Sequence, residues 1–173
     1  MSKNIHFVLK NLLSKALTVM VPDYFGLILN LIRLYTKEIL ALGENVIKDI
    51  VKIIIMRIQA DLTKGFRNTL TLAKCWNILK VICDYSEFIS KYLPIIETQM
   101  LPMFQYIDGK SNVDFDEEIV LIVSSFLSHA KKVSAVLEKM FPHFRKIFNK
   151  NKHVFGHLFQ CFNLYLIHGK EMF

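Results

Sequence analysis

The sequence has little of what marks disordered, disulfide-linked or linker-dominated chains. Its 173 residues include 6 glycines, 4 prolines and 3 cysteines. Low glycine and proline content, together with 53% hydrophobic residues, excludes a disordered or collagen-like chain. A small odd number of thiols in so apolar a chain is typical of buried hydrophobic cysteines rather than of a disulfide framework. The sequence therefore predicts a protein of a reducing compartment.

Long apolar runs are also missing. The longest stretch without Lys, Arg, Asp or Glu is 153–169, which contains three histidines and is shorter than a helical membrane span of about 20 residues. The apolar run 50–58 is interrupted by Lys52 and Arg57. The first residues contain repeated lysines and no small-residue cleavage site, so they do not resemble a signal peptide. We expect an intracellular chain without membrane insertion.

Motifs for catalysis, metals and nucleotides are absent from the sequence. Every glycine is isolated, so no glycine-rich loop is available to bind a phosphate. His153 and His157 lie four residues apart, but no glutamate follows His153 and no Cys-x-x-Cys pair could complete a zinc site. Cys75 and Cys83 are too far apart along one helix to ligate together. We therefore predict that the chain is not an enzyme and uses no metal and no cofactor.

Acidic residues are the minority charge. The 22 lysines and arginines outnumber the 15 acidic residues and give a net charge of +7. Such a balance favours acidic partners, nucleic acid or anionic lipid when the basic residues gather on one face. Here they are spread along the chain and are densest after Ser128. A solvated surface is the favoured interpretation, and nucleic acid is not an expected partner.

What the sequence does contain is helical spacing of apolar residues almost throughout, with no strict alternation of the kind that indicates a strand. Proline, glycine and polar turns divide the chain into eight predicted helices, with Asp23 and Ser134 as expected caps. The helices are expected at about 4–20, 23–36, 44–59, 67–84, 89–107, 113–130, 134–149 and 154–168.

These helices pair into hairpins at about 4–36, 44–84, 86–130 and 134–168, and the spacing of about 40 residues is typical of HEAT or armadillo units. Several helices are apolar on more than one face, as expected where each hairpin is sandwiched between neighbours. We predict an all-α fold, an α-solenoid of about four HEAT-like antiparallel helix pairs that forms a single segment over 1–173. Because neither end resembles a polar capping repeat, we expect this segment to belong to a longer solenoid.

Three blocks in a fixed order carry a resemblance to a known family. They are the Phe-x-Glu-Glu-Ile block at 115–119, Val133-Ser134, and an apolar turn at Met140-Phe141-Pro142. Together with further matches between Leu72 and Lys170, they resemble the central HEAT repeats of importin-β-type nuclear transport receptors. The resemblance is closest to the importin seven/eight branch of that family.

The resemblance implies a carrier: a segment of a nuclear import receptor that binds protein cargo and Phe-Gly nucleoporins while shuttling between cytoplasm and nucleus. It implies contact with Ran-GTP only through the full-length receptor, because the amino-terminal repeats that dominate this contact in the family are absent from these residues. Two alternatives remain open. They are a HEAT-repeat scaffold for a different protein assembly, and a basic helical module that binds RNA or acidic surfaces.

An acidic block at the start of the sixth predicted helix is a candidate cargo contact. Carboxylates at a helix start each contribute about 0.3 to 1 kcal/mol by complementing the helix dipole, and this structural interpretation is favoured. The alternative is a contact for a basic cargo on the concave side of the solenoid. The block consists of Asp114, Asp116, Glu117 and Glu118.

An aromatic series in the last two predicted helices is the second candidate site. Core packing is the favoured interpretation of aromatics at helical spacing. The functional alternative is a groove between neighbouring helices that accepts a phenylalanine side chain from a nucleoporin repeat. The candidate groove residues are Phe144, Phe148, Phe155 and Phe159.

Overall fold

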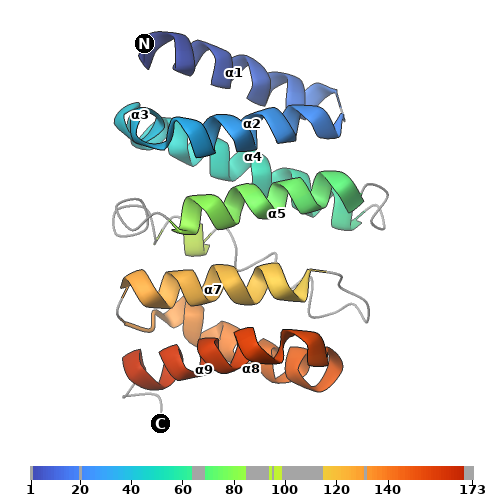
Figure 1. Cartoon of the computed structure of the whole chain (residues 1–173), viewed down its shortest axis with the longest axis vertical. Helices are drawn as coiled ribbons and strands as arrows, with labels where there is room; N and C mark the ends of the chain where they lie inside the picture. The colour runs from blue at the N-terminus through green and yellow to red at the C-terminus, as the bar shows by residue number, and fades with distance from the viewer. Residues whose placement is uncertain are drawn as a thin grey trace. The chain divides into compact units, whose positions relative to one another are not determined.

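The computed structural model describes residues 2–19, 21–63, 69–84, 94, 96–98, 115–130 and 132–169. Every regular element within these ranges is a helix, so the predicted all-α fold class is confirmed (Figure 1). The chain forms two compact units, Met1–Ile82 and Cys83–Phe173. None of the described helices combines the length and the apolarity needed to cross a bilayer.

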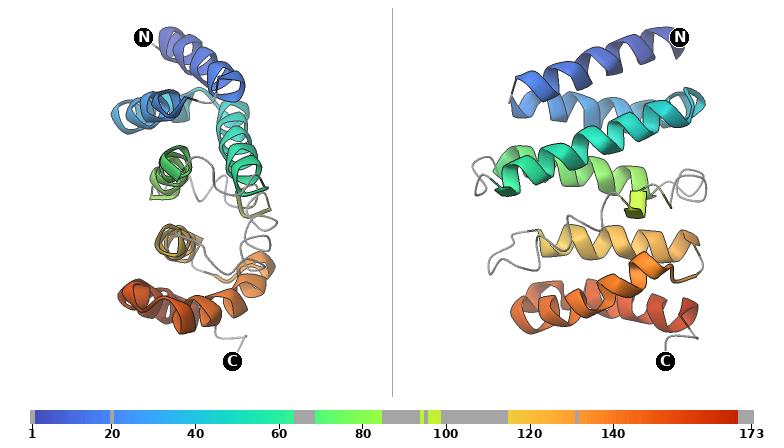
Figure 2. Two further views of the ribbon diagram at one scale, coloured as in Figure 1. Left: turned by 90° about the vertical axis from the view of Figure 1, so that its right-hand side faces the viewer. Right: turned by 180° about the vertical axis from the view of Figure 1, so that it is seen from behind.

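The first unit is built from α1 (Ser2–Thr18), α2 (Pro22–Leu34), α3 (Thr36–Ala41), α4 (Glu44–Thr63) and most of α5 (Thr69–Asp84). Helix α1 packs against α2, α3 and α4. Within this unit, α2 and α5 lie on one side and α4 lies on the other (Figure 2). Short connections between packed neighbours make consecutive long helices antiparallel, as in helical-repeat proteins.

The core of the first unit is mainly aliphatic. Apolar residues three or four positions apart form buried stripes, as the sequence predicts for helices that pack on one another. Helix α4 buries a wide stripe, and Trp76 of α5 is fully buried. The buried α4 residues are Ile47, Ile50, Val51, Ile54, Ile55 and Ile58.

A buried ion pair lies within this aliphatic core. The Arg57 guanidinium donates two hydrogen bonds to the Asp61 carboxylate, from Nε to Oδ2 at 3.0 Å and from Nη2 to Oδ1 at 2.6 Å. The two residues are only 5% and 3% exposed. A bidentate pair one helical turn apart satisfies both charges, which is the condition for tolerating them in a core.

Two local predictions in the first unit are wrong. Asp23 does not cap α2, because the helix already begins at Pro22 after Val21, with no side-chain cap bond. Proline suits the first turn since it has no N–H to be satisfied, and Asp23 instead lies there with a carboxylate oxygen 3.8 Å from Lys74 Nζ. The short helix α3 was not predicted, because six residues are too few to show a helical period.

The second unit contains α7 (Asp116–Ala130), α8 (Ala135–Lys150), the 3-10 helix η1 (Lys152–Val154) and α9 (Phe155–His168). Helix α7 contacts α8, η1 and α9. The expected cap of α8 is confirmed, since the Ser134 hydroxyl accepts a hydrogen bond from the Leu137 N–H at 3.2 Å. The predicted helix at 89–107 lies almost entirely outside the described residues.

Pro142 lies inside α8, as the predicted helix at 134–149 requires, and not in the turn that the resemblance suggested for Met140-Phe141-Pro142. A proline within a helix removes one backbone hydrogen bond and costs about 3 kcal/mol. The helix continues because residues on both sides of Pro142 bury apolar side chains on one face. These are Leu137, Met140, Phe144 and Ile147.

Candidate functional site

Three phenylalanines of α8 and α9 form an exposed aromatic surface, called here the aromatic surface. Phe148, Phe155 and Phe159 are 43%, 53% and 68% exposed. The ring centroids of Phe148 and Phe155 are 5.5 Å apart, and those of Phe155 and Phe159 are 6.5 Å apart with the rings inclined by 20°. The three rings therefore form one continuous apolar patch rather than isolated exposed residues.

The exposure follows from the spacing of apolar residues along α9. Leu158, Cys161 and Tyr165 form the buried stripe that faces the rest of the second unit. Phe155 and Phe159 lie on a different side of the same helix and have no packing partner that covers them fully. Helix α9 thus has more apolar side chains than its neighbours can bury.

A small cavity adjoins the aromatic surface. It measures about 220 Å³ and is lined by Phe141, Arg145, Phe148 and Phe162. The rings of Phe141 and Phe162 meet edge to face at 5.7 Å. The cavity is smaller than the roughly 300 to 1,000 Å³ of typical small-molecule sites, so it suits a single side chain better than a cofactor.

The structure separates Phe144 from the other three candidate groove residues. Phe144 is fully buried, with its ring 6.0 Å from that of Tyr165. It lies on the stripe of α8 that enters the core, whereas Phe141 and Phe148 lie on the neighbouring stripe that borders α9. Phe144 is therefore a core residue. The position in the groove that the spacing predicted for Phe144 is occupied by Phe141 and Phe162.

Basic residues outnumber acidic ones in the part of the sequence that carries the aromatic surface. Residues 132–169 contain six lysines and arginines but only one acidic residue, Glu138. Arg145 on α8, Lys150 at its end and Lys152 in η1 are all exposed. The described part of the chain gives these three cations no anionic partner. Their combined potential attracts negatively charged groups to this side of the second unit.

The acidic block occupies the first turn of α7 as far as it is described. Asp116 is buried, and Asn151 Nδ2 donates to its Oδ2 at 3.5 Å. Glu117 Oε1 lies 3.4 Å from His157 Nε2 on α9, and Glu118 is half-buried. Asp114 lies outside the described residues. Asp116 therefore connects α7 to Asn151, directly before η1, and Glu117 connects α7 to α9. Among the described residues of the acidic block, only Glu117 and Glu118 have accessible surface.

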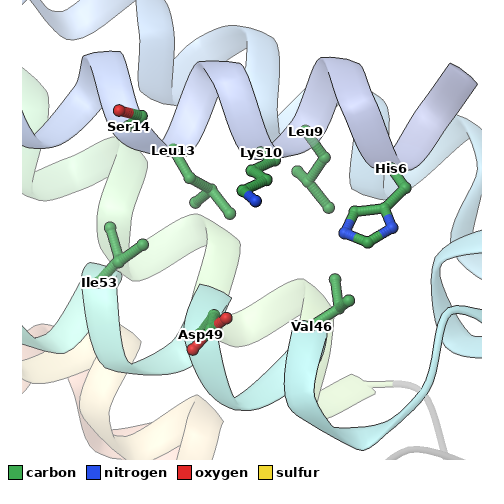
Figure 3. Close-up of a pocket in the computed structure, with 8 residues that line it drawn as sticks. All are labelled: His6, Leu9, Lys10, Leu13, Ser14, Val46, Asp49 and Ile53. Carbon is green, nitrogen blue, oxygen red and sulfur yellow. The ribbon is translucent and has the colours of Figure 1, made fainter.

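A second hollow lies in the first unit between α1 and α4. It measures about 330 Å³, and His6 and Lys10 of α1 face Asp49 of α4 across it (Figure 3). Leu9 and Ile53 contribute apolar wall. This hollow was not predicted from the sequence, because its charged residues come from helices that are far apart in the chain.

The three cysteines are free and buried. Burial raises the pKa of the Cys161 thiol to about 12, and it raises the pKa values of Cys75 and Cys83 as well. At neutral pH these groups are thiols rather than nucleophilic thiolates. Among the described residues no three His, Cys, Asp or Glu side chains gather in a way that could hold a metal ion.

Comparison with known proteins identifies no relative: no family model matches the chain, and no match is found among curated proteins or solved structures. The similarity to importin-β-type receptors therefore stays a prediction that rests on the sequence blocks alone.

Proposed function

We propose that the chain is a protein-binding segment of an importin-β-type nuclear import receptor, which acts as a carrier rather than as an enzyme in cytoplasm and nucleus. The observation that best supports this proposal is the aromatic surface, where three neighbouring phenylalanines are 43% to 68% exposed. Exposed apolar patches of this kind mark surfaces that bind other molecules.

The aromatic surface and its adjoining cavity suit phenylalanine side chains of Phe-Gly nucleoporins. Burying one phenylalanine contributes about 1.5 to 3 kcal/mol, which gives a weak and rapidly reversible contact. Several such contacts along a repetitive nucleoporin add by raising the effective concentration of the next repeat. Weak, repeated binding is what a carrier needs in order to pass through a pore without being trapped there.

Protein cargo forms the second part of the proposal. Glu117 and Glu118 supply accessible negative charge at the start of α7, which suits a basic cargo segment. Replacing both with glutamine is expected to weaken the binding of a basic cargo peptide severalfold and to leave the melting temperature of the chain nearly unchanged. Ran-GTP enters the proposal only as a partner of the full-length receptor.

The test measures binding of the 173-residue chain to immobilised Phe-Gly repeats. The variant Phe155→Ser/Phe159→Ser removes the two most exposed rings of the aromatic surface and should reduce binding at least tenfold. Phe7→Ser in α1 is the matched control, because Phe7 is 70% exposed but belongs to the other unit. It should bind as the unchanged chain does.

Two results would count against the transport proposal. A helical scaffold of another assembly would wash through the Phe-Gly matrix while remaining folded. A basic module for RNA or acidic surfaces would instead bind heparin or oligouridylate with affinity that falls steeply as salt rises. The six basic residues and single acidic residue of 132–169 make this second alternative the one to measure in parallel.

A further inference from the structure

The aromatic surface adjoins a cavity that has a cation, Arg145, on its wall, and this combination specifies the chemistry of a partner more narrowly than the apolar patch alone. Arg145 lines the same cavity as Phe141, Phe148 and Phe162, so a side chain entering the cavity lies against both a guanidinium and aromatic rings. Lys150 and Lys152 lie between Phe148 and Phe155 in the sequence, at the end of α8 and the start of η1.

We infer that the partner of this surface is an acidic peptide, in which aspartate or glutamate flanks the phenylalanine that enters the cavity. This inference rests on the proposed function and specifies the class of peptide that the aromatic surface binds. The phenylalanine packs among the cavity rings with the Arg145 guanidinium at its edge, and the flanking carboxylates pair with Arg145 and lie in the positive potential to which Lys150 and Lys152 add. Arginine above an aromatic ring and beside a carboxylate is favourable in both contacts.

Asp116 contacts Asn151, which lies between Lys150 and Lys152 in the sequence, but its carboxylate is buried and accepts a hydrogen bond from that amide. Two further acidic groups lie near this surface, Glu138 and Glu117. Glu138 lies in the first turn of α8, about three helical turns before Lys150. Glu117 contacts His157, which lies two residues from both Phe155 and Phe159. At about 100° per residue, His157 projects from nearly the opposite side of α9. The carboxylate of Glu117 is therefore held away from the side of α9 that carries Phe155 and Phe159.

The geometry favours a peptide over a nucleic acid or a lipid surface. The cavity lined by Phe141, Arg145, Phe148 and Phe162 has room for one side chain, and a base stacked on the exposed rings of Phe155 and Phe159 would leave it unfilled. The cavity of about 220 Å³ has a definite size and a cation on its wall, whereas a bilayer surface would leave such a cavity unfilled. A single aromatic side chain with charged neighbours uses both features.

Fluorescence anisotropy with the full chain tests the inference. Three labelled peptides share one Phe-Gly core and differ only in flanking residues, which are acidic, neutral or lysine-rich. At an ionic strength of about 0.05 M we expect the acidic peptide to bind at least about tenfold more tightly than the neutral one. The difference should shrink to about twofold or less near 0.5 M, since exposed pairs are screened by salt.

Charge-matched variants locate the effect. The triple variant Arg145→Gln/Lys150→Gln/Lys152→Gln should lose the preference for the acidic peptide while it still binds the neutral one. The control Lys10→Gln/Lys15→Gln/Lys52→Gln removes the same charge from exposed positions of α1 and α4 and should keep the preference. Circular dichroism of both variants confirms that the helices are intact.

The outcomes separate this inference from the proposed function. Equal binding of all three peptides that depends on Phe155 and Phe159 would overturn the acidic partner and leave Phe-Gly recognition standing. Absence of binding to every peptide would overturn both. Tighter binding to oligouridylate, or to phosphatidylserine-containing vesicles, than to the acidic peptide would overturn the inference in favour of a nucleic acid or a membrane surface.

Discussion

Helices α4 and α9 are both rich in apolar residues, yet they use them differently. Helix α4 turns a wide arc of its surface inward and buries six isoleucine and valine side chains. Helix α9 buries only the stripe of Leu158, Cys161 and Tyr165 and leaves Phe155 and Phe159 more than half exposed. Apolar content therefore does not distinguish a core helix from a binding helix. What distinguishes the two is how much of the helix surface neighbouring helices cover.

The two units also differ in how they accommodate buried acidic groups. Asp61 in the first unit is paired with the Arg57 guanidinium through two hydrogen bonds. Glu97 in the second unit is 5% exposed, and its Oε1 accepts no hydrogen bond from the described residues. Burial raises the pKa of Glu97, although Ser134 and Lys132 partly oppose the shift. Asp61 thus has a guanidinium as its partner, whereas burial favours the protonated form of Glu97.

The largest expected effect comes from breaking the ion pair of the first unit. Arg57→Met removes the cation and leaves the buried Asp61 carboxylate without its partner, at a cost of about 3 to 5 kcal/mol in the free energy of unfolding. Urea denaturation followed by circular dichroism measures this change. The double variant Arg57→Met/Asp61→Leu should recover most of the loss, because it buries neither charge. A loss below about 1 kcal/mol in the single variant would contradict the assigned role of the pair.

A paired truncation tests the contrast between α4 and α9 directly. Ile54→Ala removes a fully buried side chain and should cost about 2 to 5 kcal/mol, since a cavity remains. Phe159→Ala removes a larger but 68% exposed side chain and should change stability by no more than about 0.5 kcal/mol. Both are measured from the same denaturation curves. Similar losses for the two variants would mean that Phe159 belongs to the core.

The hydroxyl of Tyr165 should contribute a smaller amount to the second unit. It donates a buried hydrogen bond to the Leu137 backbone oxygen at 2.6 Å. Tyr165→Phe keeps the ring contact with Phe141 and leaves that oxygen without its donor, which costs about 1 to 3 kcal/mol. Thermal unfolding measures the loss. Tyr35→Phe, at a half-buried position, serves as the control and should be nearly neutral.

The smallest effect is expected from Glu97 and appears as a pH dependence. Because the folded-state pKa of Glu97 is raised above 4.5, its contribution to stability is greatest below that pH. The contribution is lost as pH rises through the folded-state pKa. Glu97→Gln should therefore become progressively more stable than the unchanged chain from about pH 4 to pH 7. A difference in unfolding free energy that stays constant over this range would show that Glu97 does not titrate abnormally.

Much of the fold was predictable from residue spacing. Helices α4, α5, α7, α8 and α9 begin within three residues of their predicted starts, because each is long enough to show several turns of the 3.6-residue period. Gly43 marks a predicted break, and its positive φ of 97° is a conformation that glycine adopts without strain. The predicted helix at 134–149 ran through Pro142, and α8 does so, because tertiary burial of its apolar stripe offsets the cost of the proline.

The candidate site was predictable only in part. The sequence grouped Phe148, Phe155 and Phe159, and the structure brings their rings into contact. The sequence also included Phe144, which lies one helical turn from Phe148 but enters the core. The sequence also grouped Asp116 with the other acidic residues at the start of a helix, whereas in the structure it is buried and contacts Asn151.

The sequence by itself determined the helical class, the approximate limits of most helices and the excess of basic over acidic residues in 132–169. These properties depend on local periodicity and on composition, which can be counted along the chain. Only the tertiary structure decided which apolar side chains remain in solvent and which ionisable groups are buried. Burial depends on how much of each helix its neighbours cover, and those neighbours come from distant parts of the chain.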